Sequence, residues 1–155
     1  MGLYSRYVLP RIVHLTCGSK PTMRQREKIV PRARGRVLEI GIGSGLNLPY
    51  YDPALVSEVV GLDPSPAITD LATEAAEAVD FDVRLLHASA EDIPLEDDGF
   101  DTLVITYTLC SIPDPAAALR EMARVLRPVS GIETMYIPGW RPACFNYWGA
   151  AQVRS

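Results

Sequence analysis

The sequence contains little cysteine and little histidine, and neither residue type is clustered. Its three cysteines stand far apart, at positions 17, 110 and 144, and none belongs to a CxxC pair. An odd, dispersed set argues against a disulfide framework and favours a reducing, cytoplasmic compartment. The two histidines, His14 and His87, belong to no HxxxH or HExxH pattern, so we expect no metal site.

Long apolar runs and an excess of basic charge are also lacking. No apolar run reaches the roughly 18–20 residues of a membrane span, and we expect no signal peptide at the N-terminus. The net charge of −4 gives no overall basic field, which argues against nucleic-acid binding. Basic residues are nevertheless concentrated at Lys20, Arg24, Arg26, Lys28, Arg32, Arg34 and Arg36. We interpret this segment either as a solvated helix face and turn, or as a contact with an anion or a membrane surface.

Short apolar segments alternate with helical segments through the middle of the chain. Strands are predicted at residues 36–41, 57–63, 82–88 and 100–107, with a fifth at 131–139. Helices are predicted at residues 22–30, 66–79 and 114–128. With 155 residues we expect one domain of the α/β class, with a mostly parallel sheet covered on both faces.

The last of these helices has the clearest signals. Asp114 is a favourable N-cap, and Pro115 occupies the first helical position. Its apolar residues at helical spacing, which we expect to face the core, are Leu119, Met122, Ala123 and Leu126.

The carboxyl ends of parallel strands meet at one edge of such a sheet, and ligands of this fold class bind there. The loops that follow the predicted strands carry Glu39–Gly45, Asp63, Ala88–Asp92 and Thr106–Ser111. We therefore expect these four segments to surround a ligand.

The first of these loops, in VLEIGIGSGLN, has glycine at every second position. Gly41 is expected to adopt a backbone conformation closed to other residues, and Gly43 to let a ligand approach the main chain. Gly45 is predicted to open a short helix, whose free N–H groups favour a carboxylate. A purely structural tight turn is the alternative interpretation. A dinucleotide site requires GxGxxG, and Leu46 stands where its last glycine belongs, which disfavours a pyrophosphate ligand.

Acidic residues complete the predicted ligand site. Asp63 is placed to accept hydrogen bonds from both hydroxyl groups of a ribose, or alternatively to cap the segment after Pro64. Asp92 is placed to accept from an adenine amine, with Glu91 as the alternative. Glu39 ends a buried strand, so its carboxylate needs a partner, either a ligand ammonium group or the N–H groups of its own loop. With no phosphate-binding lysine and no Mg²⁺ ligand set, these groups fit a cationic nucleoside that carries an amino acid, S-adenosylmethionine.

Several segments also resemble a known family. VLEIGIGSGLN, GLDPS, ASAEDIPLEDDGFD and YTLCSIPDPAAALREMARVLRP are similar to the motifs of class I S-adenosylmethionine-dependent methyltransferases. LPRIVHLTCGSKPTMRQREKIVP and TLCSIPDP resemble the small-molecule branch that includes thiol and lipid methyltransferase-like proteins. The resemblance covers residues 5–128 and implies a Rossmann-like three-layer sandwich.

The resemblance implies S-adenosylmethionine as cofactor, S-adenosylhomocysteine as product, and in-line transfer of a methyl group to a small-molecule acceptor. The implied cofactor contacts are Glu39, Gly41, Gly43, Gly45, Asp63, Pro64, Ala90, Glu91, Asp92, Thr106 and Tyr107. The substrate side is implied at Leu109–Ser111 and in the N-terminal segment.

No catalytic residue is assigned. His14, Asp114 and Tyr107 are candidate general bases, and none stands out. Cys110 is a candidate nucleophile, although we favour for it the role of a small apolar residue that ends a buried strand. Two other functions stay open: a nicotinamide-dependent oxidoreductase, and a catalytically impaired cofactor-binding or assembly protein.

The resemblance ends at Pro128, and Val129 and Ser130 stand where relatives usually have two glycines. We therefore divide the single domain 1–155 into an N-terminal helical segment (1–35), a cofactor-binding core (36–128) and a divergent C-terminal tail (129–155). The C-terminal strands of the family are expected to be missing, which leaves a sheet of about five strands.

An unclosed sheet exposes a strand edge that favours pairing with another chain. We hypothesise a homodimer in which this edge is covered by Ile132–Ile137, Trp140 and Phe145–Trp148.

Overall fold

The computed structural model describes residues 20–128, and a four-stranded parallel sheet forms its centre. The strands are β1 (Gly35–Ile40), β2 (Val56–Leu62), β3 (Asp82–Leu86) and β4 (Thr102–Ile105). Their order across the sheet is β3-β2-β1-β4. β2 and β3 are thus added on one side of β1, and β4 is added on its other side. The register sets Leu38 of β1 between Val60 of β2 and Leu103 of β4. These strands confirm the four predicted within the described residues.

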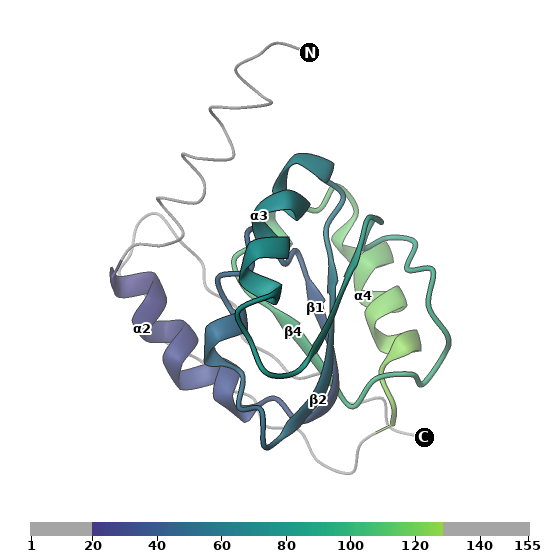
Figure 1. The fold of residues 1–155 in the computed structure, drawn as a ribbon. Coiled ribbons are helices and arrows are strands. Elements are labelled where there is room, and N and C mark those ends of the chain that lie inside the picture. Colours follow the sequence, from purple (N-terminus) through teal and green to yellow (C-terminus); the bar gives the residue numbers. More distant parts are fainter. Residues whose placement is uncertain (1–19, 129–155) are drawn as a thin grey trace.

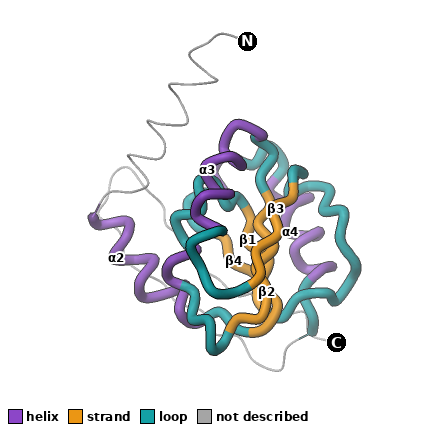
Figure 2. Tube along the Cα trace, viewed as in Figure 1, coloured by secondary structure: helices purple, strands orange, loops and turns teal. Residues whose placement is uncertain are grey.

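Helices cover both faces of the sheet. α2 (Lys20–Ile29) and α3 (Pro66–Ala76) lie on one side of it, and α4 (Pro115–Val125) lies on the other (Figure 1). The strands, drawn in orange, form the middle of three layers (Figure 2). This arrangement confirms the predicted Rossmann-like three-layer sandwich.

The sheet separates two apolar cores because successive side chains of a strand point to opposite faces. Leu38 and Ile40 of β1 pack with Phe100 and α4, whereas Val37 packs with the residues beneath α3. All four strand and loop residues named here are at most 1% exposed. The same alternation directs Glu39, next to Leu38, toward the α2 and α3 side.

Of the four residues predicted to face the core from α4, only Met122 is buried, and Ala123 and Leu126 are half-buried. Ala118, Met122 and Val125 are buried, whereas Leu119 is 52% exposed. Spacing of three and four residues fits both faces, and α4 turns the face with the small residue Ala118 toward the closely packed sheet. The prediction that Leu119 faces the core is wrong.

The N-cap of α4 is as predicted. Asp114 Oδ1 accepts hydrogen bonds from the backbone N–H groups of Ala116 and Ala117, and Pro115 opens the helix. Replacing Asp114 with alanine is expected to lower the free energy of unfolding by about 1 kcal/mol, because two N–H groups lose their acceptor. Urea unfolding followed by circular dichroism measures this loss. Asp114→Asn retains an acceptor and serves as the control, and equal losses in both variants would contradict a capping role.

Several predictions lie outside the described residues. They are the fifth strand at 131–139, the tail at 129–155, His14, and the dimer contacts at Ile132–Ile137, Trp140 and Phe145–Trp148. Within residues 20–128, no helix combines the length and the apolar character needed to cross a bilayer.

Candidate functional site

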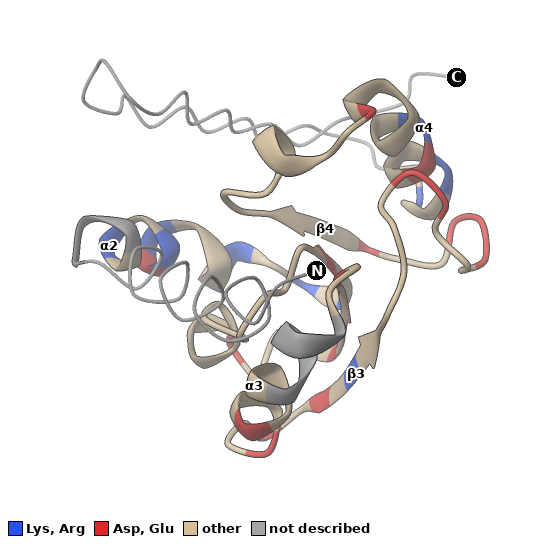
Figure 3. Ribbon diagram, turned by 90° about the horizontal axis from the view of Figure 1, so that it is seen from above, with Lys and Arg blue, Asp and Glu red and all other residues tan. Residues whose placement is uncertain are grey.

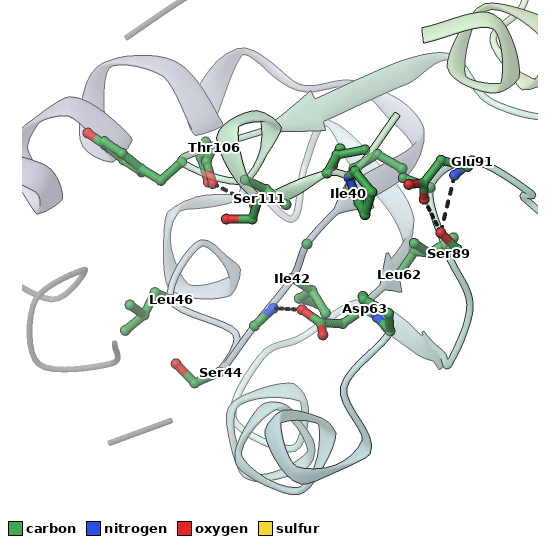
Figure 4. Close-up of a pocket in the computed structure, with 18 of the residues that line it drawn as sticks. Ile40, Ile42, Ser44, Leu46, Leu62, Asp63, Ser89, Glu91, Thr106 and Ser111 are labelled. Atoms are coloured by element: carbon green, nitrogen blue, oxygen red, sulfur yellow. Dashed lines mark hydrogen bonds between the residues drawn. The ribbon is translucent and has the colours of Figure 1, made fainter. Parts of the chain in front are cut away.

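A cavity of about 470 Å³ opens at the carboxyl edge of the sheet. Residues at the ends of β1, β2 and β4 and in the loop after β3 line it, and Arg26 reaches it from α2. Half of the lining side chains are apolar, among them Ile42, Leu62, Leu71 and Ile112. Figure 4 shows Asp63 on one side of the cavity, with Thr106 and Ser111 on the other.

The cavity brings together most of the residues that the sequence singled out. The predicted residues that line it are Gly41, Gly43, Asp63, Pro64, Ala90, Glu91, Thr106 and Tyr107. Three others, Glu39, Gly45 and Asp92, are not among the lining residues. The contact of all eleven with a cofactor stays a prediction.

Gly41 has the backbone conformation that was expected of it, and the other two glycines of the loop share it. Gly41, Gly43 and Gly45 have φ values of +70°, +58° and +75°, in the left-handed region that favours glycine. A Cβ on Gly41 would also overlap the side chain of Thr108. Both the backbone conformation and the lack of space therefore exclude alanine at this position. A Cβ on Gly45 would lie 2.8 Å from Cβ of Ala75, so that glycine allows α3 to pack closely against the loop.

The predicted helix after Gly45 is not present as an α-helix. The chain turns at Gly45 and forms only a three-residue 3₁₀-helix at Leu48–Tyr50. Pro49 lies within this segment, and its neighbours pack into the core rather than continue a helix. The prediction that a helix begins at Gly45 is therefore wrong.

Asp63 lies at the end of β2, faces the cavity and is 9% exposed. Its Oδ2 atom accepts from the Gly43 N–H at 3.1 Å, and its Oδ1 atom accepts from the Ser65 N–H at 2.9 Å. The first of these bonds is drawn in Figure 4. Each carboxylate oxygen can accept a second hydrogen bond, so Asp63 fixes the two loops and still has acceptor capacity for a ligand.

The acid pair after β3 is divided by the fold. Glu91 lines the cavity, whereas Asp92 is exposed and lies outside the lining. The Glu91 carboxylate accepts from the Ser89 hydroxyl and, at 3.3 Å, from the Asp114 N–H. The Ser89 hydrogen bond holds the pKa of Glu91 below its usual value. Of the two alternatives for the adenine contact, the structure places Glu91 at the cavity.

Glu39 lies beneath the cavity, with side-chain partners that sequence reasoning did not foresee. It is 1% exposed, and its carboxylate accepts from Asn47 Nδ2 at 2.8 Å and from the Tyr51 hydroxyl at 2.7 Å. Burial raises the pKa of Glu39 to about 7, although Tyr51, Asn47 and the charge of Arg26 oppose this shift. Its partners among the described residues are thus Asn47 and Tyr51 rather than the N–H groups of the glycine loop.

Arg26 extends this buried network to the cavity wall. Its Nη1 atom donates to Asn47 Oδ1 and, at 3.1 Å, to Thr106 Oγ1, and Asn47 Nδ2 lies 3.0 Å from the same oxygen. The guanidinium also lies over the ring of Tyr107, 5.3 Å from its centre. Arg26 is 5% exposed and Asn47 is fully buried.

Sequence reasoning missed Arg26, Asn47 and Tyr51. The available signal for Arg26 was weak, because it belongs to the basic segment at 20–36, whose Arg24, Lys28 and Arg34 are exposed as expected for a solvated face. Figure 3 shows basic residues, in blue, along α2. A buried acid at position 39 implied that donors must exist, but their identity depends on which segments pack against β1.

The loop after β4 differs from expectation at Cys110. This cysteine is exposed in the 3₁₀-helix Leu109–Ser111 and is not among the cavity-lining residues. The prediction that it ends a buried strand is wrong, because β4 ends at Ile105. Tyr107, two residues after the end of β4, has a φ of +58°. Its hydroxyl group donates a hydrogen bond to Gln25 Oε1 at 2.7 Å.

Asp114, one of the candidate general bases, has a structural role outside the cavity. Asp114 caps α4 and does not line the cavity, and His87 is exposed. Within residues 20–128, no cluster of three or more His, Cys, Asp or Glu side chains is arranged to hold a metal ion.

The raised pKa of Glu39 predicts a specific pH dependence of stability. Its pKa is about 7 in the folded protein, against 4.5 as its ordinary value, so the folded state binds more protons between these values. This contribution to stability is complete below the unfolded pKa and is lost as pH rises through the folded pKa, by about 3 kcal/mol in total. We expect Glu39→Gln to lose this part of the pH dependence.

Urea unfolding of both proteins at pH 5 and pH 8 measures the difference. Other acids have lowered pKa values, such as Glu121 and Asp101, and they change the pH dependence of stability with the opposite sign. These acids are present in both proteins, so the difference in free energy of unfolding between the wild type and the variant isolates Glu39. The same pH dependence in both proteins would show that Glu39 does not titrate differently on folding.

The described sequence and fold match known proteins. The sequence profile of the family described as "Methyltransferase domain" matches residues 38–131, more than half of the chain. A phosphatidylethanolamine N-methyltransferase of Cereibacter sphaeroides is 36% identical over 107 residues, which are 67% of this chain and 52% of that protein. A demethylmenaquinone methyltransferase of Thermus thermophilus is 32% identical over 127 residues, 80% of this chain and 58% of that protein.

A solved structure supports the fold alone. The crystal structure of a SAM-dependent methyltransferase from Aquifex aeolicus superimposes with a TM-score of 0.65 at 23% sequence identity, over 77% of this chain and 68% of that one. The chain spans about half the length of the curated relatives it matches.

Proposed function

The chain belongs to the family of methyltransferase domains, and we propose that it binds S-adenosylmethionine and transfers the methyl group to a small-molecule acceptor. The observation that carries this proposal is the position of Asp63 and the glycine loop on one cavity at the carboxyl edge of the sheet. The relatives named above carry the names of methyltransferases, which supports the same reaction class.

The residues present fit this donor. The cavity volume of about 470 Å³ is in the range of ligand sites, and its apolar lining suits an adenine ring. The carboxylate of Asp63 retains acceptor capacity for the ribose hydroxyl groups. Among the described lining residues Arg26 is the only Lys or Arg, which does not suit a pyrophosphate group and disfavours a dinucleotide.

The chain contributes position rather than covalent chemistry. S-Adenosylmethionine supplies an electrophilic methyl group on a sulfonium and leaves as the neutral thioether S-adenosylhomocysteine. Asp63, the glycine loop, Glu91 and the pair Thr106 and Tyr107 would hold the donor. The segment Leu109–Ser111, of which Ser111 lines the cavity, would face the acceptor. Alignment of the reacting atoms is worth up to about 7–11 kcal/mol in favourable cases.

Further parts of the proposal concern the whole protein. We propose a cytoplasmic protein whose acceptor is a small molecule. The exposed basic residues of α2 and the following turn, Arg24, Lys28 and Arg34, are the candidates for a peripheral membrane contact. A homodimer through the open sheet edge is the proposed assembly. Centrifugation with anionic vesicles tests the membrane contact, and light scattering tests the dimer.

Calorimetric titration tests the donor. S-Adenosylhomocysteine should bind the folded chain, and NAD should not; failure of S-adenosylhomocysteine to bind would overturn the proposal. A methyl-transfer assay with thiol, quinol and phosphatidylethanolamine acceptors then tests the reaction. Binding without transfer to any acceptor would favour the alternative of a cofactor-binding protein without turnover.

A further inference from the structure

Arg26 is a cavity residue whose charge has no part in the donor contacts described above. Its side chain is 5% exposed, and one of its nitrogen atoms, Nη1, is bound to Asn47 and Thr106. Its buried Nε atom has no hydrogen-bond partner in the part of the chain that the structure describes. A buried N–H group without an acceptor is unfavourable. The guanidinium of Arg26, a residue that lines the cavity, is therefore incompletely paired among the described residues.

The acids of the cavity do not supply that acceptor. Asp63 holds the N–H groups of Gly43 and Ser65, and Glu91 holds Ser89 and the N–H of Asp114. Glu39 approaches Arg26 only through Asn47, which accepts from Arg26 and donates to Glu39. The cavity therefore presents a buried cation without a direct carboxylate partner among the described residues.

The donor brings a carboxylate that was expected to meet a helix N-terminus in this loop. The three-residue 3₁₀-helix at Leu48–Tyr50 offers no helix N-terminus for it. Arg26 and the glycine loop line the same cavity, so a ligand whose amino-acid end meets the loop has one cation within the described lining.

We infer that Arg26 binds the carboxylate of the donor and that the chain Arg26–Asn47–Glu39 couples this contact to the uptake of a proton by Glu39. The inference rests on the proposed function, since it takes the identity of the donor from it. Arg26 is then a binding residue, and Asn47 and Glu39 are positioning residues that act through it.

The coupling follows from the groups that face Glu39. Arg26 faces it from α2, and Asn47 and Tyr51 face it from the segment after β1; the flanking strands place Gly61 and Val104 beside it. Arg26 is the charge that favours ionised Glu39. A ligand carboxylate on Arg26 offsets that charge, so Glu39 takes a proton from solvent, and the Tyr51 hydroxyl oxygen can accept it in a hydrogen bond.

Calorimetry with two ligands tests the carboxylate contact. S-Adenosylhomocysteine and its decarboxylated analogue differ only by that group. Arg26→Gln should weaken binding of S-adenosylhomocysteine by about tenfold or more and leave the analogue within about twofold. Arg24→Gln removes an exposed arginine from the same helix and should leave both ligands within about twofold.

The possible results are distinct. Equal losses for both ligands, or no loss for either, would overturn the role of Arg26. If Arg26→Gln does not fold, the wild type decides, because equal affinity for the two ligands overturns the inference while leaving the proposed function intact. If neither ligand binds the folded wild type, the proposed function is wrong, and the inference fails with it.

Proton uptake tests the coupling by itself. Titration of the wild type with S-adenosylhomocysteine at pH 7, in buffers with different ionisation enthalpies, should show uptake of a fraction of a proton. The decarboxylated analogue, and the variant Glu39→Gln with either ligand, should show none. Since the bound state holds more protons, affinity should rise as pH falls from 8 to 6; no uptake by the wild type would overturn the coupling.

Discussion

Replacing Asp63 with alanine is expected to weaken binding of S-adenosylhomocysteine by about 10- to 150-fold, because hydrogen bonds to a charged group contribute about 1.5–3 kcal/mol. The carboxylate already holds Gly43 and Ser65 through their N–H groups, so the substitution also loosens the two loops that form this side of the cavity. Both effects act in the same direction on affinity. Isothermal titration calorimetry measures the change.

The control is an aspartate at the opposite edge of the sheet. Asp82 is exposed at the start of β3, and Asp82→Ala changes the net charge in the same way. Its affinity should equal that of the wild type. Unchanged affinity in Asp63→Ala would remove Asp63 from the site, and an equal loss in both variants would indicate a general effect of charge.

Replacing Asn47 with leucine is expected to lower the free energy of unfolding by about 3–5 kcal/mol, because two buried charged groups lose a partner at once. Asn47 donates to Glu39 at 2.8 Å and accepts from Arg26. Leucine has a side chain of similar size but no polar atoms. The loss therefore reports hydrogen bonding rather than an empty space.

A smaller deletion in the same network provides the comparison. Tyr51→Phe removes only the hydroxyl group that donates to Glu39 at 2.7 Å, so its cost should be about 1–3 kcal/mol. Urea unfolding at pH 7 orders the two variants. If Asn47→Leu were as stable as the wild type, the buried chain from Glu39 to Arg26 would not hold the structure together.

The sheet and its ligand edge could be predicted because their signals are local. Each described strand is a short apolar segment followed by a loop, and apolar residues of this kind form parallel strands that meet at one edge. The φ of Gly41 followed from the alternating glycines, and the position of Asp63 followed from its place directly after a strand. Neither depends on a distant part of the chain.

Other features could not be read from local patterns. Helical spacing alone did not distinguish the buried Ala118 from the exposed Leu119, since both recur with Met122 at three or four residues. Cys110 was interpreted as a small apolar residue that ends a buried strand, but β4 ends at Ile105 and Cys110 lies in the 3₁₀-helix that follows. In both cases the competing structures have similar local preferences, and packing selects between them.

The sequence by itself determined the order of strands and helices, the left-handed glycine loop and the acid that faces the cavity. Only the tertiary structure decided that Arg26 reaches Thr106, 80 positions further along the chain, and that Asn47 joins it to Glu39. The physical reason is that a buried charge requires a partner but does not specify which one. The partner is set by the packing of α2 against the sheet, which depends on contacts between segments far apart in the sequence.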